Sequence, residues 1–534
     1  MRHFYLALSL VLLFGACTNK EEKNKNTIAT SESNPKKTQK LFKYLSAEET
    51  GVKFENRFKP ETEYKFFKFE YLFNGGGVGV IDINNDGLMD VYLSGNEVAS
   101  KLYLNKGDFK FEDITDKAGV ALADRWCNGV AVADVNGDGY SDLYISCGGM
   151  KDGEGRSNVL LINQGDLSFS DQSKELGVAD TGYSTQSAFL DIDKDGDLDL
   201  YVLNHNNQWL SDSKLTKEKP QRPLQADRLY RNDNGKFVNV SKAAGLNYER
   251  MGGWGLGIAT GDVNRDGYPD IYISNDYDSP DFFYINQGDG TFKDELQDRT
   301  NHISLYSMGN DMADINNDGL IDIFTLDMAA EDNERIKTQM SAMNPEKFYS
   351  LVNFGVPYQY MYNALHLNNG NGSFSDIAQM AGIHSTDWSW APIFVDFDMD
   401  GWKDLFVSNG YRIDDRDNDY MVKNGKTYGA KIDDPDFEAK KRFEEAPKTP
   451  LPNYVYQNNG DMTFSKKSYE WGLGDKGFSQ GSASADLDND GDLDLVINNI
   501  NDVAWIYENK ANEKFDNQFL KVRIEGSDKN TRGI

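Results

Sequence analysis

The chain has 534 residues and a formal net charge of −30, from 56 Lys and Arg against 86 Asp and Glu. A phosphate backbone is bound by basic surfaces, so this acidic balance argues against nucleic acid as a partner. The length is well beyond that of one ordinary domain, which indicates either several domains or one large repeat architecture.

Residues 1–17 have the pattern of an export signal. A basic start is followed by an apolar run from Phe4 to Phe14, too short to span a bilayer, and then by two small residues before Cys17. This pattern resembles a bacterial lipoprotein signal, in which Cys17 would be lipidated and become the mature N-terminus. An ordinary cleaved signal peptide with an incidental cysteine is the alternative. We therefore expect an outer-membrane lipoprotein exposed at the surface, or otherwise a periplasmic or secreted protein.

Residues 18–40 are rich in Lys, Glu, Asn, Ser and Thr. Such a segment cannot bury a core, so we expect a disordered tether between the lipid and the folded part. The N-terminal lipid is then the only expected contact with the membrane.

The strongest pattern is a nine-residue motif, Asp-x-(Asp/Asn)-x-Asp-Gly-x-x-Asp, which occurs seven times. Oxygens at positions 1, 3, 5 and 9 and the backbone carbonyl of position 7 form a cage for a hard cation, and Gly at position 6 permits the sharp turn. Calcium fits these ligands, whereas zinc does not, because the motif holds no His or Cys. The predicted calcium ligands are, in copy order, Asp82, Asn84, Asp86, Leu88, Asp90; Asp134, Asn136, Asp138, Tyr140, Asp142; Asp191, Asp193, Asp195, Asp197, Asp199; Asp262, Asn264, Asp266, Tyr268, Asp270; Asp314, Asn316, Asp318, Leu320, Asp322; Asp396, Asp398, Asp400, Trp402, Asp404; and Asp486, Asp488, Asp490, Asp492, Asp494.

Asp-rich turns without metal are the alternative, but so many neighbouring carboxylates would repel one another. Up to seven structural Ca²⁺ ions are expected, and seven would change the formal charge from −30 to −16. The predicted metal therefore accounts for much of the acidity.

The residues around each motif predict strands. Alternating or β-branched segments flank the motif, as at Val130–Ala133 and Leu143–Ile145, so the motif joins two strands. A third strand ending in Asn follows, as at Leu102–Asn105, and then a fourth segment that runs from Phe to Gly, as at Phe111–Gly119. We predict an all-β fold for residues 41–510: a seven-bladed β-propeller of four-stranded antiparallel blades with calcium-binding hairpin loops.

The seventh unit has no Phe-to-Gly segment after its third strand. A matching segment, Leu41–Leu45, stands before the first motif. We predict that this N-terminal strand completes the seventh blade and closes the ring, which removes open sheet edges.

These motifs and blades resemble the FG-GAP/VCBS repeats of integrin-α-like propellers, and the whole resembles the cartilage-acidic-protein and ASPIC/UnbV family. Residues 511–534 resemble the start of that family's C-terminal module; we expect the chain either to be a fragment truncated in this module or to have diverged at this end. The resemblance implies loops that bind Ca²⁺ and a propeller that serves adhesion or ligand binding, without established catalysis.

The connections between the second and third strands emerge on the face opposite the motifs, here called the insertion face. Long insertions fall there, at Asn204–Asp227, Asp327–Tyr362 and Asn409–Asn453. Aromatic residues enter the innermost strands on the same face, so we expect a glycan or protein ligand there. Wedges that pack one blade against the next are the alternative for these aromatics, which are Phe73, Trp126, Tyr183, Trp254, Tyr306, Trp388, Trp390 and Phe478.

No nucleophile elbow, phosphate-binding Gly loop or His-Glu-x-x-His motif occurs in the sequence, so we predict no catalytic residues. The alternative is a polysaccharide lyase or glycosidase that uses a carboxylate pair on the insertion face, for instance Asp414 or Asp415 with Asp387.

Two cysteines other than Cys17, namely Cys127 and Cys147, flank the second motif on its two predicted strands. A cross-strand disulfide is one expectation in an oxidising compartment, and two buried free thiols are the other.

Overall fold

The structure, a computed structural model, describes residues 40–534 except for 64, 66–68, 150–152, 207–223, 247–252, 278, 340–343, 354, 429–434, 523, 525, 527–529 and 531–534. The predicted signal peptide with Cys17, and the tether up to residue 39, lie outside the described residues.

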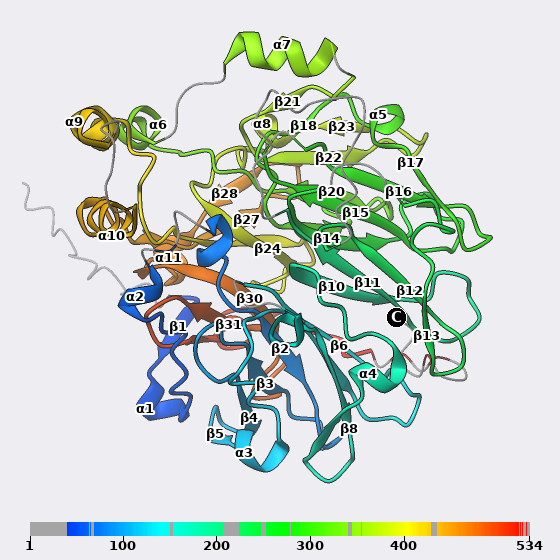
Figure 1. Cartoon of the computed structure of the whole chain (residues 1–534). Helices are drawn as coiled ribbons and strands as arrows, with labels where there is room; N and C mark the ends of the chain where they lie inside the picture. The colour runs from blue at the N-terminus through cyan, green and yellow to red at the C-terminus, as the bar shows by residue number, and fades with distance from the viewer. Residues whose placement is uncertain are drawn as a thin grey trace, which may run out of the picture. The chain divides into compact units, whose positions relative to one another are not determined.

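The described chain from Lys40 onward forms seven four-stranded antiparallel sheets, the blades of a propeller (Figure 1). The innermost strand of each blade contacts the innermost strands of both neighbours, so the ring is closed. Blades 1 to 4 consist, from the inner to the outer strand, of β2 (Val78–Ile81), β3 (Asp90–Leu93), β4 (Lys101–Asn105) and β5 (Phe111–Asp113); β6 (Cys127–Ala133), β7 (Asp142–Cys147), β8 (Val159–Asn163) and β9 (Phe169–Asp171); β10 (Ser184–Leu190), β11 (Asp199–Asn204), β12 (Arg228–Asn232) and β13 (Phe237–Asn239); and β14 (Gly255–Gly261), β15 (Asp270–Asn275), β16 (Phe282–Asn286) and β17 (Phe292–Asp294).

Blades 5 to 7 follow the same order, and the predicted closure is confirmed. In blade 7 the outer strand comes from the start of the folded chain, with Phe42 paired to Asn509 and Leu45 to Ile506. These blades consist of β19 (Asn310–Ala313), β20 (Asp322–Thr325), β22 (Ala364–Asn368) and β23 (Phe374–Asp376); β24 (Ser389–Val395), β25 (Asp404–Asn409), β27 (Tyr454–Asn458) and β28 (Phe464–Lys466); and β30 (Ser479–Ala485), β31 (Asp494–Asn499), β32 (Trp505–Asn509) and β1 (Phe42–Leu45).

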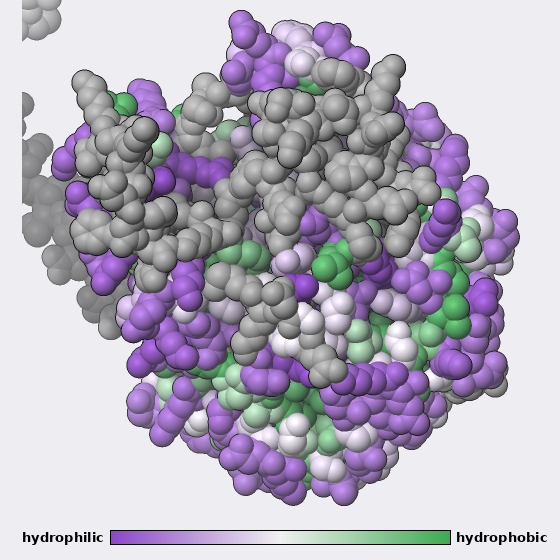
Figure 2. All heavy atoms as spheres, in the orientation of Figure 1, coloured by the Kyte–Doolittle hydropathy of each residue, from purple (hydrophilic) through white to green (hydrophobic). Residues whose placement is uncertain are grey.

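The core lies between the blades, because both faces of each sheet are covered by a neighbour. The second strands are buried along their whole length. The third residue of this strand is a fully buried aromatic ring in six blades, namely Tyr92, Tyr144, Tyr201, Tyr272, Phe324 and Phe406. On the face drawn in Figure 2, the rim is mostly hydrophilic and hydrophobic residues appear in patches inside it.

Glycines allow the inner strands to approach one another closely at the axis. A Cβ on Gly309 would lie 2.0 Å from the Trp390 carbonyl oxygen, and one on Gly129 would lie 2.7 Å from the Thr185 carbonyl oxygen. Any side chain there would clash with the backbone of the next blade, so the narrow axis depends on glycine.

The predicted Phe-to-Gly segments are only partly strand. Each begins with three strand residues and continues in a helical turn that ends at a glycine with a left-handed backbone, as at Gly119 with φ 75°. These turns are α3 (Thr115–Ala118), α4 (Ser173–Leu176), α8 (Ala378–Ala381) and α11 (Ser468–Trp471). Glycine is favoured at this position because it adopts positive φ without strain.

Most of the remaining elements lie in the connections between strands. Two small sheets pair β18 (Ile303–Ser304) with β21 (Gln359–Tyr360) and β26 (Leu451–Pro452) with β29 (Lys476–Gly477). The helices are α1 (Ala47–Thr50), α2 (Pro60–Glu63), the 3-10 turns η2 (Glu70–Phe73) and η3 (Gly153–Arg156), α5 (Leu296–Arg299), α6 (Asn333–Thr338), α7 (Pro345–Asn353), α9 (Asn418–Tyr428), α10 (Pro435–Glu445) and α12 (Ala511–Lys514). Within the described part of the chain, every helix is too short or too polar to cross a membrane.

Candidate functional site: the loop face and the insertion face

Each of the seven motifs joins the first and second strands of a blade, as predicted, and the face that carries them is called the loop face here. The turn needs two left-handed residues. In the first loop these are Asn85 at position 4, with φ 57°, and Gly87 at position 6, with φ 87°. The sequence motif reveals the glycine, but it does not reveal position 4, which holds Asn, Gly, Lys, Arg or Met in different copies.

Backbone amides hold the loop aspartates in fixed orientations. In the first loop the Asp82 carboxylate accepts hydrogen bonds from Asp86 N at 3.2 Å and Gly87 N at 3.0 Å. Asp86 in turn accepts one from Leu88 N at 2.9 Å. The carboxylates are therefore held by the turn itself, before any cation is considered.

The aspartate at position 9 is buried and has a second role. Asp90 accepts hydrogen bonds from Ile83 N at 3.0 Å and from Asn105 N, at the end of the third strand, at 2.7 Å. Both bonds recur in all seven blades. Burial raises the pKa of Asp90 to about 7 and those of Asp199 and Asp404 to about 8. A positive charge nearby would therefore stabilise the ionised forms.

The asparagine that ends the third strand connects neighbouring loops. The side-chain amide of Asn163 donates to the carbonyl of Ile83, in the loop of the preceding blade, at 2.9 Å. The equivalent bond is present from Asn105, Asn286, Asn368, Asn458 and Asn509. The sequence shows this asparagine in every blade, but its contact with the neighbouring loop requires the ring.

The loops fit a hard cation by two observations. In the three copies with Asp at position 3, oxygens of the aspartates at positions 1, 3 and 9 lie within 4.8 Å of one another. Asp191 Oδ1 and Asp398 Oδ1 are buried and have no hydrogen-bond partner among the described residues. Burying an unpaired carboxylate oxygen is costly, so these atoms call for a cation or another donor. The residues present therefore fit Ca²⁺, with oxygen ligands only.

The insertion face carries α6, α7, α9 and α10, which lie in the long connections of blades 5 and 6 (Figure 1). Part of the predicted insertion at Asn204–Asp227 lies outside the described residues. A further segment on this face, residues 54–77, is called the cover segment here; the sequence assigned only its Phe73 to this face. It contains α2 and η2 and connects β1 to β2.

The cover segment packs against some of the aromatic residues that the sequence predicted for a ligand. The Phe58 ring lies 5.4 Å from that of Trp126, and the Tyr71 ring lies 5.6 Å from that of Trp254. Tyr71 also donates a hydrogen bond to Asp276 at 3.1 Å.

Half of the aromatic residues predicted for a ligand are buried in this structure. Phe73, Trp126, Trp254 and Trp388 are at most 8% exposed and belong to one hydrophobic core cluster. Tyr183, Tyr306, Trp390 and Phe478 are partly buried at the edge of that cluster. The first group is thus buried in the core of this face, whereas the second group retains surface that a ligand can reach.

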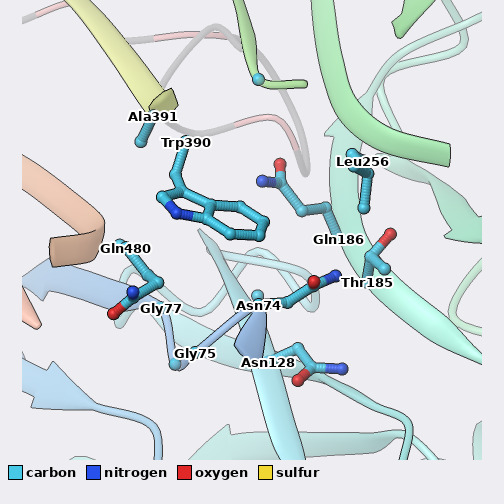
Figure 3. A pocket seen from close by; sticks show the side chains of 14 residues that line it. Asn74, Gly75, Gly77, Asn128, Thr185, Gln186, Leu256, Trp390, Ala391 and Gln480 are labelled. Atoms are coloured by element: carbon cyan, nitrogen blue, oxygen red, sulfur yellow. The ribbon is translucent and has the colours of Figure 1, made fainter. Parts of the chain in front are cut away.

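A pocket opens at the axis where the innermost strands begin (Figure 3). Its cavity volume is about 80 Å³, and its lining includes residues from the start of every blade. Figure 3 shows the Trp390 indole reaching across the pocket, with Gln480 and Gln186 on opposite sides of the ring. Trp390 is therefore the predicted aromatic residue that lies in a pocket.

Two of the three carboxylates considered for a glycosidase or lyase, Asp387 and Asp414, are engaged by an arginine. The third, Asp415, has a buried Oδ1 with no hydrogen-bond partner among the described residues, and burial raises its pKa. Arg335, from α6, forms two hydrogen bonds to Asp387, at 2.5 and 2.8 Å, and lies 3.7 Å from Asp414. Thr449 donates to Asp414 at 2.5 Å. Asp387 also has a positive φ of 63°. Asp387 and Asp414 thus share one buried cation, which joins the insertions of blades 5 and 6.

Cys127 and Cys147 lie opposite each other on the neighbouring strands β6 and β7, as the sequence predicts. Their sulfurs lie 3.8 Å apart, and both residues are buried free thiols in this structure. Burial raises the pKa of the Cys147 thiol well above its usual value.

Comparison with known proteins places the repeats in a family. The profile of the FG-GAP-like repeat matches residues 82–145, 221–273, 269–325, 352–407 and 448–497, which together make up just over half of the chain. Cartilage acidic protein 1 of Xenopus tropicalis is 28% identical over 263 residues, covering 46% of this chain and 39% of that protein. The Homo sapiens protein of the same name is 22% identical over 463 residues, covering 84% of this chain and 59% of that protein.

The chain spans less than two thirds of the length of these relatives. Among solved structures, one described as YCF48 bound to D1 peptide matches with a TM-score of 0.37 and 8% identity, over 81% of this chain and 91% of that one.

Proposed function

The chain belongs to the FG-GAP-like repeat family, and from that premise we propose that it is a calcium-stabilised propeller scaffold that binds a glycan or protein ligand at its insertion face. The observation that carries the proposal is the contrast between the faces. One face repeats the same oxygen-lined loop seven times, while the other carries the long insertions and the axial pocket. Repetition suits a structural metal, and variable connections on a rigid scaffold suit recognition.

Calcium has a structural role in this proposal. Positions 1, 3, 5 and 9 and the carbonyl of position 7 hold the ion in each loop. The bound cation neutralises carboxylates that are otherwise crowded, and so stabilises the folded ring.

The ligand is bound without a catalytic step. Arg335 neutralises Asp387, the carboxylate common to both pairs considered for a polysaccharide lyase or glycosidase, and it also neutralises Asp414. The buried, unpaired Oδ1 of Asp415 is the observation that keeps the enzyme as the alternative.

We further propose that the chain acts outside the cytoplasm, tethered to the outer membrane by lipid at Cys17 and exposed at the surface. The apolar run before Cys17 and the polar residues after it support this location, with the periplasm or secretion as the alternative. The lipid is then the only contact with the membrane, and the acidic balance disfavours nucleic acid as a partner.

The test is a binding screen against glycan and protein arrays, run in Ca²⁺ and in EDTA, beside an assay for released reducing ends on the same polysaccharides. The scaffold predicts binding that depends on calcium and leaves the polysaccharide intact. Release of saccharide that is lost in Asp387→Asn and Asp414→Asn would overturn the scaffold and establish the enzyme.

A further inference from the structure

The axial pocket is uncharged in a strongly acidic protein. None of its 14 lining residues is Asp, Glu, Lys, Arg or His, although charged residues make up 27% of the chain. Its polar lining consists of amides and one hydroxyl, from Asn74, Asn128, Thr185, Gln186 and Gln480. A charged ligand would find no counter-ion here, so the lining selects for an uncharged one.

One side-chain amide in the pocket, that of Gln480, has only its nitrogen hydrogen-bonded among the described residues. Gln480 is 2% exposed, and its Nε2 donates to the Gly410 carbonyl at 3.3 Å. Its Oε1 has no hydrogen-bond partner among the described residues. A buried acceptor without a donor costs on the order of 1–3 kcal/mol, so a hydroxyl or water that donates to it is favoured.

The position of Gln480 depends on a glycine that also lines the pocket. A Cβ on Gly75 would lie 2.6 Å from both Cβ and Cγ of Gln480, and Gly75 has a φ of 75°. A residue larger than glycine at position 75 would clash with Gln480. The close packing of Gly75 therefore holds the Gln480 side chain at the pocket wall.

A hydrogen bond and neighbouring aromatic rings hold the Trp390 indole in place. Its Nε1 donates to the Gly410 carbonyl at 2.8 Å, so the indole has no free polar group to offer. The ring lies 6.4 Å from that of Tyr411, which stacks on Trp388 at 3.7 Å. The pocket thus presents a fixed, flat, apolar surface beside neutral amides (Figure 3).

A pyranose ring has C–H groups on one face and hydroxyl groups around its edge. It can stack on an indole with that face and exchange hydrogen bonds with amides through its hydroxyls. A protein partner would bury on the order of 1,000 Å² over a broad surface, whereas this site is one small cavity with a volume of about 80 Å³. A cavity of this size accepts the edge of one sugar ring and not a whole oligosaccharide.

From these observations, the geometry points to the axial pocket as a binding site for the terminal residue of an uncharged glycan, with Trp390 as the stacking surface and the neutral amides of the lining as hydrogen-bond partners. This inference rests on the proposed ligand-binding function and names its ligand class. Uronic and sialic acids are disfavoured, because no Lys or Arg lines the pocket.

The inference is tested by saturation-transfer NMR of the full chain in Ca²⁺ with free neutral oligosaccharides and with matched uronate oligosaccharides. The same glycans attached to a carrier protein form a second arm, which distinguishes a free saccharide from a glycoprotein as the source. Neutral glycans are expected to bind, and uronates are expected to bind at least about tenfold more weakly.

Three variants locate the site. Trp390→Ala is expected to weaken neutral-glycan binding by about tenfold or more, through loss of stacking. Gln186→Glu places a charge at the half-buried edge of the pocket and is expected to weaken binding without removing the indole. Tyr349→Ala removes an exposed ring on α7, outside the pocket, and is the matched control that should leave binding unchanged.

Binding of neutral glycans that survives in both Trp390→Ala and Gln186→Glu would overturn the inference, as would a preference for uronates. Binding of a protein ligand with no glycan binding would also overturn it, while the scaffold function would stand. Circular dichroism of each variant separates loss of the site from loss of the fold, and Gln186→Glu remains informative if Trp390→Ala does not fold.

Discussion

On the loop face, the position-9 aspartate accepts the same two backbone hydrogen bonds in every blade. On the insertion face, the connection between the second and third strands runs from five residues in blade 7, at 500–504, to residues 410–453 in blade 6. Both faces are built on the same seven sheets. The difference shows that the strands set the frame. Under the proposed function, stability and recognition are assigned to opposite ends of it.

The two faces also treat buried charge differently. On the loop face, carboxylates such as Asp191 and Asp398 have oxygens without a hydrogen-bond partner among the described residues. On the insertion face, Asp387 and Asp414 are neutralised by Arg335 from the same chain. The loop carboxylates therefore need a cation from solution, whereas the two carboxylates beside Arg335 do not. Calcium removal should therefore destabilise the loop face and leave the contacts of Arg335 unchanged.

Removal of calcium is expected to have the largest effect. EDTA should lower the melting temperature of the full chain by more than about 10 °C, because each ion held at a hundred times its dissociation constant contributes about 2.7 kcal/mol. Differential scanning calorimetry in Ca²⁺, in EDTA and in EDTA with excess Mg²⁺ measures this. Mg²⁺ should restore little, since it favours smaller six-coordinate sites. An unchanged melting temperature in EDTA would refute structural calcium.

Substitution of Arg335 is the counterpart on the insertion face. Arg335→Ala leaves Asp387 and Asp414 buried without a cation, which should lower the free energy of unfolding by about 3–5 kcal/mol. The loss should be equal in Ca²⁺ and in EDTA, as measured by urea unfolding. Lys466→Ala, which breaks the exposed ion pair with Glu331, is the control and should cost less than about 1 kcal/mol. If Arg335→Ala lowered the free energy of unfolding only in Ca²⁺, the stability of the insertion face would depend on calcium. That result would contradict the independence of the two faces.

A pair of substitutions in one loop distinguishes the backbone role from the metal role. Asp404 accepts hydrogen bonds from Phe397 N and Asn458 N, so Asp404→Asn turns an NH₂ group toward one of these donors. It should cost about 2 kcal/mol even in EDTA. Asp400→Asn keeps an oxygen for Trp402 N and should cost stability only when calcium is present. Equal effects of the two variants in EDTA would show that position 9 has no separate backbone role.

The sequence predicted the loop face and the ring because they depend on local repetition. The seven motifs fix the hairpins, and the missing outer strand after Trp505–Asn509 identified Phe42–Leu45 as its replacement. Both inferences follow from the spacing of Asp, Gly and alternating apolar residues, which is preserved from blade to blade.

The insertion face was less predictable, because its contacts join residues that are distant in sequence. Arg335 and Asp387 are 52 positions apart, and Tyr71 reaches Asp276 across the ring. The cover segment has no strand periodicity and no counterpart in other blades. Its density of aromatic residues between Phe58 and Phe73 was the available signal, since exposed aromatics at that density are unusual.

The smallest expected effect concerns the contacts between neighbouring loops. The position-4 side chain of Asn317 donates to the Gly401 carbonyl of the next loop at 3.0 Å, and Asn85 and Asn489 make the same bond to Gly139 and Gly87. In the second loop, position 4 is Gly137, which has no side chain to reach the third loop.

Asn317→Gly should therefore lower the free energy of unfolding by about 0.5 kcal/mol, since the bond is exposed, and should weaken calcium binding by less than about threefold. Gly137→Asn should have the opposite sign, because it adds the missing donor. Both positions have positive φ, 57° and 72°, so each exchange also changes the backbone contribution, with opposite sign in the two variants. Urea unfolding and calcium titration by calorimetry measure the two effects. Changes of the same sign in both variants would contradict a stabilising role for the bond between loops.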